Sequence, residues 1–365
     1  KLVYDSTIGF WIEQYLLNPL AFTPSVSSFT VDGASSQNRE VAGSGDEAAP
    51  AFVMAYVGTP SAAEITLDTP PAITGYPLTV GTPFTSATGA VYAKKTSVAA
   101  VRTFTVTATV AGTAGLTRNA TITYLNRRYA GPNAQSTILS SAQVLALDGA
   151  GGTSDLSTTQ FPTYTDLITT AAGEYIWFAH RDALAAIGAD GMSVESAVDG
   201  AQEIVGFTNM GTITHVNDSG FSELFRLYRT TNTNFGASRT FVAASTRRNN
   251  RIYMGPATDT DPIGNASILT LDDTADGESF VGSAVGGPRT YTAIKIEAGE
   301  YLWFCHPAAI ADLATIKDGT TGFAIAGSYR TNVSHTNAIG YTETYRCWRS
   351  DNTAIYPSGE NIVVT

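Results

Sequence analysis

The sequence predicts a mostly β protein that contains an internal repeat. Asn126–Pro132 (NRRYAGP) returns as Asn250–Pro256 (NRIYMGP), and Gly173–His180 (GEYIWFAH) returns as Gly299–His306 (GEYLWFCH). A repeat of about 120 residues is much longer than a solenoid unit of about 20–50 residues, so it indicates two whole domains. The residues that recur are aromatic, glycine and polar framework residues. This indicates a shared architecture in the first place and not a shared catalytic site.

Composition limits the classes of protein to which the chain can belong. It has 365 residues, of which 43% are hydrophobic and 15% are charged, enough for two or three domains with their own cores. The longest apolar runs fall short of the ~20 residues that a transmembrane helix needs, so we expect no membrane insertion. The net charge of −11 argues against nucleic acid as a partner, because phosphate binding requires clustered Lys and Arg.

Residues 1–22 form a distinct leader, which we expect to be a helical or extended anchor. Asp5, Ser6 and Thr7 are candidate helix N-caps, and Pro19 is a stop signal. The residues that share one face at helical spacing are Ile8, Trp11, Ile12, Tyr15 and Leu16. A lone helix of about ten residues is marginal in water, so this face has to dock on the neighbouring domain or on another protein.

Residues 23–125 are expected to form one β-sandwich. In Thr103–Val110 threonines alternate with apolar residues, which is the pattern of a half-buried strand. Gly and Pro separate this segment from other short runs of the same kind, for example at Thr69–Pro71. About one hundred residues organised in this way are typical of an immunoglobulin-like sandwich, here without the cysteine pair of a disulfide-bridged domain.

Residues 126–246 and 247–365 are the two repeats, each predicted to be a β-sandwich-like domain. In each repeat we expect one strand from the Asn-Arg pair, one through the Gly-Glu-Tyr-aromatic segment and one through Ser222–Arg229 or Thr342–Arg349. Short helical turns are expected near Ser140–Leu147 and Pro307–Leu313. The apolar residues on both faces of the middle strand predict that it is covered on both sides.

Few residues suggest chemistry, and we predict no catalytic, cofactor-binding or metal-binding residue. The histidines occupy matching places, His180 with His306 and His215 with His335, as a shared framework or a two-histidine metal site would require. Cys305 and Cys347 are the only cysteines; whether they are bonded stays open, and free buried thiols are the favoured interpretation.

Acidic residues offer no clear hydrolytic site. Asp259, Asp261, Asp272 and Asp273 lie close together in expected loops. A glycoside hydrolase instead needs two carboxylates about 5–9.5 Å apart on opposite sides of a cleft. We therefore expect the chain not to be an enzyme.

Several of these segments resemble structural proteins of tailed bacteriophages. Ser25–Gly33 and Thr121–Gly131 are similar to the start and exit of an immunoglobulin-like module found there. The segment from Gly173, together with Gly220–Arg229 and Gly340–Arg349, resembles the β-rich domain that accompanies this module. The resemblance covers nearly all of the chain after residue 22.

The resemblance implies a non-enzymatic virion protein, assembled in the cytoplasm of the host bacterium. It would form a fibre or appendage of the tail or baseplate, with residues 1–22 docked on other virion proteins and the distal β-domains displayed for host attachment. A homo-oligomer is expected, and a trimer fits the habit of fibres. Whether the protein sits on the tail or the head, which receptor it binds and how many copies associate stay open.

Three alternatives remain at this stage. The chain could be a fibre that recognises host-surface glycan, in which case exposed aromatic residues such as Tyr341 and Trp348 would be the place of contact. It could be a tailspike that degrades surface polysaccharide. It could also be a head fibre or decoration protein.

Overall fold

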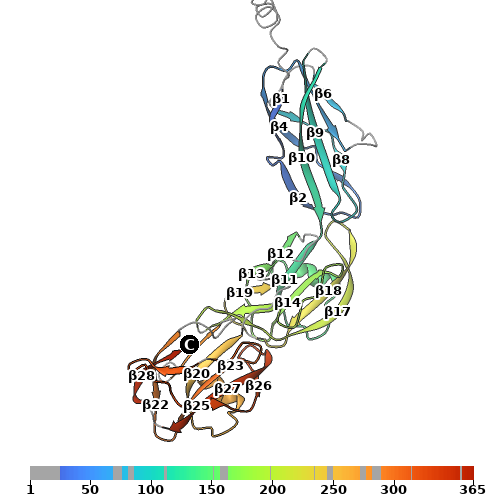
Figure 1. The fold of residues 1–365 in the computed structure, drawn as a ribbon. Coiled ribbons are helices and arrows are strands. Elements are labelled where there is room, and N and C mark those ends of the chain that lie inside the picture. Colours follow the sequence, from blue (N-terminus) through green and yellow to red (C-terminus); the bar gives the residue numbers. More distant parts are fainter. Residues whose placement is uncertain are drawn as a thin grey trace, which may run out of the picture. The chain divides into compact units, whose positions relative to one another are not determined.

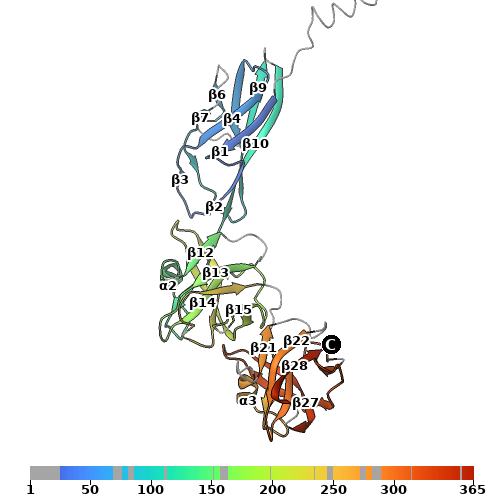
Figure 2. The same cartoon turned by 90° about the vertical axis from the view of Figure 1, so that its left-hand side faces the viewer.

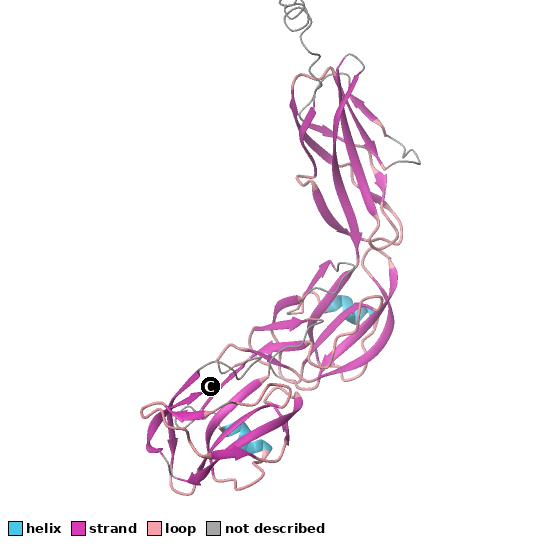
Figure 3. Ribbon diagram, viewed as in Figure 1, coloured by secondary structure: helices cyan, strands magenta, loops and turns pink. Residues whose placement is uncertain are grey.

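A computed structural model of the chain describes residues 25–68, 76–80, 86–110, 113–150, 152–156, 163–197, 199–233, 235–244, 250–271, 277–281, 289–313, 315–353 and 356–365. The described chain is mostly β, as predicted, and strands dominate it (Figures 1 and 3). It divides into two compact units. Of the described residues, the first unit holds those from Ser25 to Arg127, Leu156 and Val216–Glu223, and the second unit holds the rest.

The strands of the first unit form a two-layered sandwich. β1, β4 and β7 pair in one layer, while β2, β10, β9, β5 and β6 pair in the other; a parallel bridge between β1 and β10 connects the layers. The strands are β1 (Ser25–Val31), β2 (Ser36–Glu40), β3 (Asp46–Glu47), β4 (Ala51–Val57), β5 (Ala62–Leu67), β6 (Leu78–Val80), β7 (Ser86–Thr88), β8 (Tyr92–Ala93), β9 (Val101–Val110) and β10 (Thr113–Leu125).

The core of this sandwich follows from the alternation in the sequence. Along β9, Phe104, Val106 and Ala108 are fully buried while the intervening threonines are half-buried. Phe104 meets the ring of Phe52 on β4 edge-on at 5.3 Å, so residues of both layers share one apolar cluster. Burying these side chains stabilises the sandwich by about 1.5–3 kcal/mol for each large residue.

The described residues of the first repeat form two sheets and one helix. One sheet has the order β12-β11-β14-β18-β17, and the other has the order β13-β19-β15-β16. The elements are β11 (Arg127–Asn133), α2 (Ser141–Ala146), β12 (Thr153–Leu156), β13 (Tyr164–Ile168), β14 (Tyr175–Arg181), β15 (Met192–Glu195), β16 (Gln202–Ile204), β17 (Phe207–Val216), β18 (Ser222–Thr230) and β19 (Arg239–Ala243).

The second repeat has the same arrangement. Its larger sheet has the order β21-β20-β23-β27-β25, with β26 also paired to β27, and its smaller sheet has the order β22-β28-β24. The elements are β20 (Arg251–Ala257), α3 (Asn265–Thr270), β21 (Glu278–Val281), β22 (Arg289–Ile296), β23 (Tyr301–Pro307), β24 (Ile316–Asp318), β25 (Gly327–Tyr329), β26 (Val333–Thr336), β27 (Thr342–Thr353) and β28 (Tyr356–Val364).

Equivalent side chains surround Trp177 and Trp303, both fully buried. Trp177 lies opposite Gly131 of β11 and Trp303 opposite Gly255 of β20. The cluster of Trp177 contains Tyr129, Leu139, Val144, Leu147, Ala179, Phe225 and Leu227. The cluster of Trp303 contains their counterparts Tyr253, Ile263, Ile268, Leu271, Cys305, Tyr345 and Cys347. One packing scheme therefore serves both repeats.

The helices agree with the prediction in the first repeat and depart from it in the second. The helical turn expected near Ser140–Leu147 is confirmed as α2, which a capping box between Ser140 and Gln143 begins (Figure 2). The one expected near Pro307–Leu313 is instead a short turn closed by the hydrogen bond from Ile310 N–H to the Pro307 carbonyl, 2.9 Å. The second repeat has its helix, α3, at the place equivalent to α2.

Candidate functional sites: a repeated junction and an open hollow

A turn of the second repeat docks against the first repeat inside the second unit. In the turn Asn337–Gly340, the Asn337 side-chain oxygen accepts the Tyr341 N–H at 2.8 Å, and Gly340 takes a positive φ of 87°. The Asn337 side-chain N–H then donates to the Ile204 carbonyl at 2.8 Å. Asn337 is 3% exposed, so a buried amide joins the two repeats.

A buried arginine lies beside this turn. The Arg251 guanidinium is within 3.2 Å of the Glu203 carboxylate and donates to both oxygens of Asp199 at 2.9 and 3.0 Å. Burial alone would lower the pKa of Arg251, but the hydrogen bonds and charges of Asp199 and Glu203 raise it. The same hydrogen bond from Arg251 is the main cause that lowers the pKa of Asp199. The pair is therefore ionised at neutral pH and holds the first repeat to the second.

Gly206 allows the two backbones to approach. A Cβ added at Gly206 would overlap the Gly340 carbonyl oxygen and lie 2.6 Å from the Thr231 hydroxyl. The Thr231 hydroxyl also donates to the Gly206 carbonyl at 3.1 Å. Only glycine leaves room for the incoming turn at this position.

The first unit contains the same set of contacts. The Asn217 side-chain N–H donates to the Val41 carbonyl at 2.9 Å, and Arg127 pairs with Glu40 at 3.2 Å. A Cβ added at Gly43 would overlap the Gly220 carbonyl oxygen. Glu40, Val41 and Gly43 thus have the spacing of Glu203, Ile204 and Gly206, and each set receives an Asn-X-X-Gly turn. We call this set of contacts the junction.

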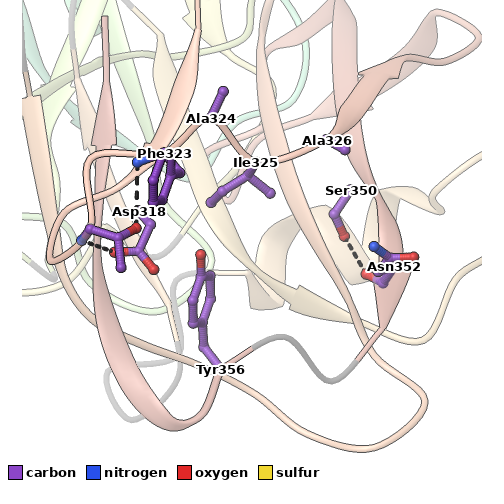
Figure 4. Close-up of a pocket in the computed structure, with 9 residues that line it drawn as sticks. Asp318, Phe323, Ala324, Ile325, Ala326, Ser350, Asn352 and Tyr356 are labelled. Atoms are coloured by element: carbon purple, nitrogen blue, oxygen red, sulfur yellow. Dashed lines mark hydrogen bonds between the residues drawn. The ribbon is translucent and has the colours of Figure 1, made fainter.

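The second repeat carries an open hollow of about 290 Å³. Its described lining consists of Asp318, Thr321, Phe323, Ala324, Ile325, Ala326, Ser350, Asn352 and Tyr356. Figure 4 shows Asp318 and Phe323 at one end, Ser350 and Asn352 at the other, and the Tyr356 hydroxyl pointing into the space between them. Phe323 is 77% exposed, the largest fraction among the described exposed apolar side chains.

The hollow occupies the position at which the first repeat receives the turn. Ser350 donates to the Asn352 carbonyl and Thr230 to the Asn232 carbonyl, at 2.8 and 2.9 Å. Asn232 in turn donates its side-chain N–H to the Ala338 carbonyl at 3.4 Å, whereas the Asn352 side chain is exposed. The first repeat has a corresponding hollow of about 240 Å³, and Ala338 and Ile339 of the turn form part of its wall.

The hollow differs from the junction at the residues that matter for docking. The N–H of Val205 bonds the Met192 carbonyl and that of Ile325 bonds the Ile316 carbonyl, which makes Val205 and Ile325 equivalent. Ala326 then stands in the place of Gly206, and Phe323 in the place of Glu203. In the second repeat, alanine therefore replaces the glycine of the junction, and an exposed phenylalanine replaces its glutamate.

The residues predicted as contact sites have different positions. Ile8, Trp11, Ile12, Tyr15 and Leu16 lie outside the described residues. The prediction that Trp348 is exposed is wrong: it is 7% exposed and packs in the core of the second repeat, because both faces of β27 are covered. Tyr341 is half-buried directly after the junction turn. Neither residue lines the hollow.

The histidines are fully buried and bond to nearby groups. His180 and His306 lie 2.8 and 3.0 Å from the carbonyls of the residues that follow them. His215 lies 3.1 Å from the Ser141 hydroxyl, and His335 lies 3.3 Å from the Tyr253 hydroxyl. Within the described ranges no three His, Cys, Asp or Glu residues gather as metal ligands.

Burial lowers the pKa of His180 and of His335 to about 4. Desolvation is the largest cause in both residues, and it also lowers the pKa of His306. The folded second unit therefore holds these rings neutral at pH values at which the unfolded chain, with a histidine pKa near 6.5, already binds protons. The stability that this provides is fully present above about pH 6.5 and is lost as the pH falls from there toward 4.

We accordingly expect the free energy of unfolding of the second unit to fall by about 2 kcal/mol for each of His180 and His335 between pH 7 and pH 5. Urea titrations at both pH values measure this difference. In the His335→Phe variant the free energy of unfolding should fall by about 2 kcal/mol less over the same pH range, because one buried histidine has been removed. An equal fall in the variant and the parent protein would contradict the assignment.

The two cysteines face each other without a bond. Cys305 of β23 lies directly opposite Cys347 of β27, and both are free, fully buried thiols. Burial raises the pKa of the Cys305 thiol, with the neighbouring Cys347 as a further cause. This agrees with the favoured interpretation of free thiols, and it places them in the core beside Trp303.

Comparison with known proteins finds no matching family model, no matching curated protein and no matching solved structure. In the part of the chain that the structure describes, no helix has the length and apolar character needed to cross a membrane.

Proposed function

We propose that the chain is a non-enzymatic structural protein of a tailed-phage virion, which forms a fibre or appendage of the tail or baseplate. Its N-terminal segment would dock on other virion proteins, and its distal β-domains would be displayed for attachment to the host surface. The observation that carries this proposal is the junction, which occurs twice with the same asparagine, arginine, glutamate and glycine contacts.

The junction supports an architectural role because of what its recurring contacts do. In the second unit the Arg251–Glu203 pair and the Asn337 amide are almost completely buried, so moving one repeat against the other would expose or break them. Within the second unit, the polar residues shared by the two repeats thus hold one repeat to the other. The resemblance of the sequence to phage modules is the reason for proposing that this architectural role belongs to a virion.

A second candidate function is recognition of host-surface glycan, and the open hollow favours it over polysaccharide degradation. Among the described lining residues, Asp318 alone has a carboxylate. Hydrolysis of a glycosidic bond by the usual mechanism requires two. The described lining of the hollow thus offers groups that can bind a ligand and a single carboxylate.

Labelling of particles tests the proposed function. An antibody raised against the purified full-length chain would be applied to intact tailed phage particles from the source that encodes it, followed by electron microscopy with a gold conjugate. We expect gold at a fixed position on the tail or baseplate; gold on the capsid would favour the head-fibre alternative over the tail assignment. Unlabelled particles, with the chain present only in the soluble fraction of the lysate, would contradict the proposal.

A further inference from the structure

We propose that the open hollow of the second repeat is a binding site for a neutral or amino sugar of a surface glycan. The site is formed by Phe323, Tyr356, Asp318 and Asn352. This inference rests on the proposed function in attachment, for which it supplies the ligand class. It moves the glycan contact away from Tyr341 and Trp348.

The hollow is no longer suited to a further junction turn. At both junctions a Cβ on the glycine would overlap a carbonyl oxygen of the docked turn. Ala326 places a Cβ at that position, so the same turn cannot approach as closely. Phe323 also replaces the glutamate that would receive the arginine of the next domain. A domain docked in the same way as at the two junctions therefore does not fit the hollow.

The exposed groups match the surface of a sugar ring. A pyranose has an apolar face of C–H groups and an equatorial rim of hydroxyl groups. Phe323 offers an exposed aromatic ring on which such a face can stack, as bases stack on aromatic side chains in nucleic-acid sites. Asn352 offers an exposed amide that both donates and accepts hydrogen bonds, which suits a hydroxyl group.

Asp318 is held in place as a hydrogen-bond acceptor. One carboxylate oxygen accepts the N–H groups of Thr321 and Thr320 at 2.7 and 2.8 Å. These hydrogen bonds, and another from the Tyr356 hydroxyl, lower the pKa of Asp318. The residue is therefore ionised at neutral pH and points an acceptor into one end of the hollow (Figure 4).

The local charge selects among sugars. Asp318 lines the hollow, Glu360 accepts a hydrogen bond from Thr320 of the same turn, and Asp351 lies next to Asn352. Arg330 pairs with Asp351 at 3.3 Å, so the negative charge near the hollow comes mainly from Asp318 and Glu360. An anionic saccharide would be repelled here, whereas a neutral sugar would not and an amino sugar would be attracted. The volume of about 290 Å³ is at the lower end of ligand pockets and suits one or two sugar rings.

Ligand-observed NMR with the full-length chain tests this inference. The probes are oligosaccharides of neutral hexoses, of N-acetylglucosamine and of glucosamine, with oligogalacturonate as the anionic probe. We expect saturation transfer to at least one neutral or amino sugar and none to oligogalacturonate. The absence of transfer to every neutral and amino probe would overturn the proposal, as would transfer to oligogalacturonate alone.

Two variants locate the binding. Phe323→Ala removes an exposed ring that supports no core, and we expect it to weaken binding about tenfold or more. Leu167→Ala, which removes another exposed apolar side chain of the second unit (61% exposed), is the matched control and should leave binding unchanged. Equal affinity of the Phe323→Ala variant and the parent chain would place the sugar elsewhere and refute the site.

Failure of this inference is distinguishable from failure of the proposed function. If the sugar experiments fail while gold labels the particles, the chain is a virion protein that uses another means of attachment. If sugar binds in the hollow while the particles stay unlabelled, the glycan site stands and the virion assignment falls.

Discussion

Replacing Arg251 by methionine is expected to lower the free energy of unfolding of the second unit by about 3–5 kcal/mol. Methionine keeps most of the side-chain volume and removes the charge. Glu203, which is 3% exposed, would then remain as a buried carboxylate without its arginine. Urea unfolding followed by tryptophan fluorescence measures the effect, because Trp177, Trp303 and Trp348 all belong to the second unit.

The Arg127→Met variant is the matched control. Arg127 has the same position at the first junction, but its side chain is 35% exposed and that of Glu40 is 16% exposed. Water can therefore solvate the remaining carboxylate, and we expect a loss of about 1 kcal/mol or less in the first unit, measured by circular dichroism. Losses of equal size at the two arginines would show that burial does not set the strength of the junction.

A double variant separates the ion pair from packing. In Arg251→Met combined with Glu203→Leu both buried charges are gone, so much of the stability lost in the single variant should return. Asp199 keeps its charge, but its side chain is 36% exposed and can be hydrated. A double variant no more stable than Arg251→Met would contradict the explanation that the loss comes from removing the arginine that pairs with Glu203.

Replacing Gly206 by alanine is expected to lower the free energy of unfolding of the second unit by about 1–3 kcal/mol. The added Cβ would overlap the Gly340 carbonyl, a backbone atom that cannot rotate away. The turn Asn337–Gly340 would have to shift, and the hydrogen bond from Asn337 to the Ile204 carbonyl would lengthen or break. The same urea titration measures this loss.

Gly188→Ala is the control for this substitution. A Cβ at Gly188 would have its nearest contact at 3.5 Å, from the Asp190 carboxylate, which is ordinary van der Waals contact. We expect its stability to change by no more than about 0.5 kcal/mol. If Gly206→Ala is as stable as Gly188→Ala, the close approach at the junction is not a constraint on the fold.

The strands could be predicted because the repeats and the alternation carry strong local signals. β14 and β23 cover the expected Gly-Glu-Tyr-aromatic segments from the tyrosine onward, and the threonine alternation of β9 matches its burial. The helix α3 was missed because its N-cap, Gly264, makes no side-chain hydrogen bond, so the sequence has no capping signal there. Trp348 was misplaced because the sequence around it does not reveal that a second sheet covers the outer face of β27.

The junction could be predicted only in part. The repeated Asn-Arg pair was visible in the sequence, but the matching Glu40–Gly43 segment was not. It lies in a domain that is otherwise unlike the repeats, and four residues are too few to stand out without their spatial partners. The hollow could not be predicted from the sequence. It is recognised as the counterpart of the junction only when the structure shows that Ala326 is equivalent to Gly206.

Hydrogen exchange of side-chain amides by NMR tests the central claim. This claim is that the same junction contacts occur at Asn217 and at Asn337, and that they are replaced in the hollow of the second repeat. Asn217 and Asn337 donate from buried positions to the Val41 and Ile204 carbonyls, while Asn352 is exposed in the hollow. We predict slow exchange at Asn217 and Asn337 and fast exchange at Asn352. Exchange at Asn217 or Asn337 as fast as at Asn352 would contradict the account.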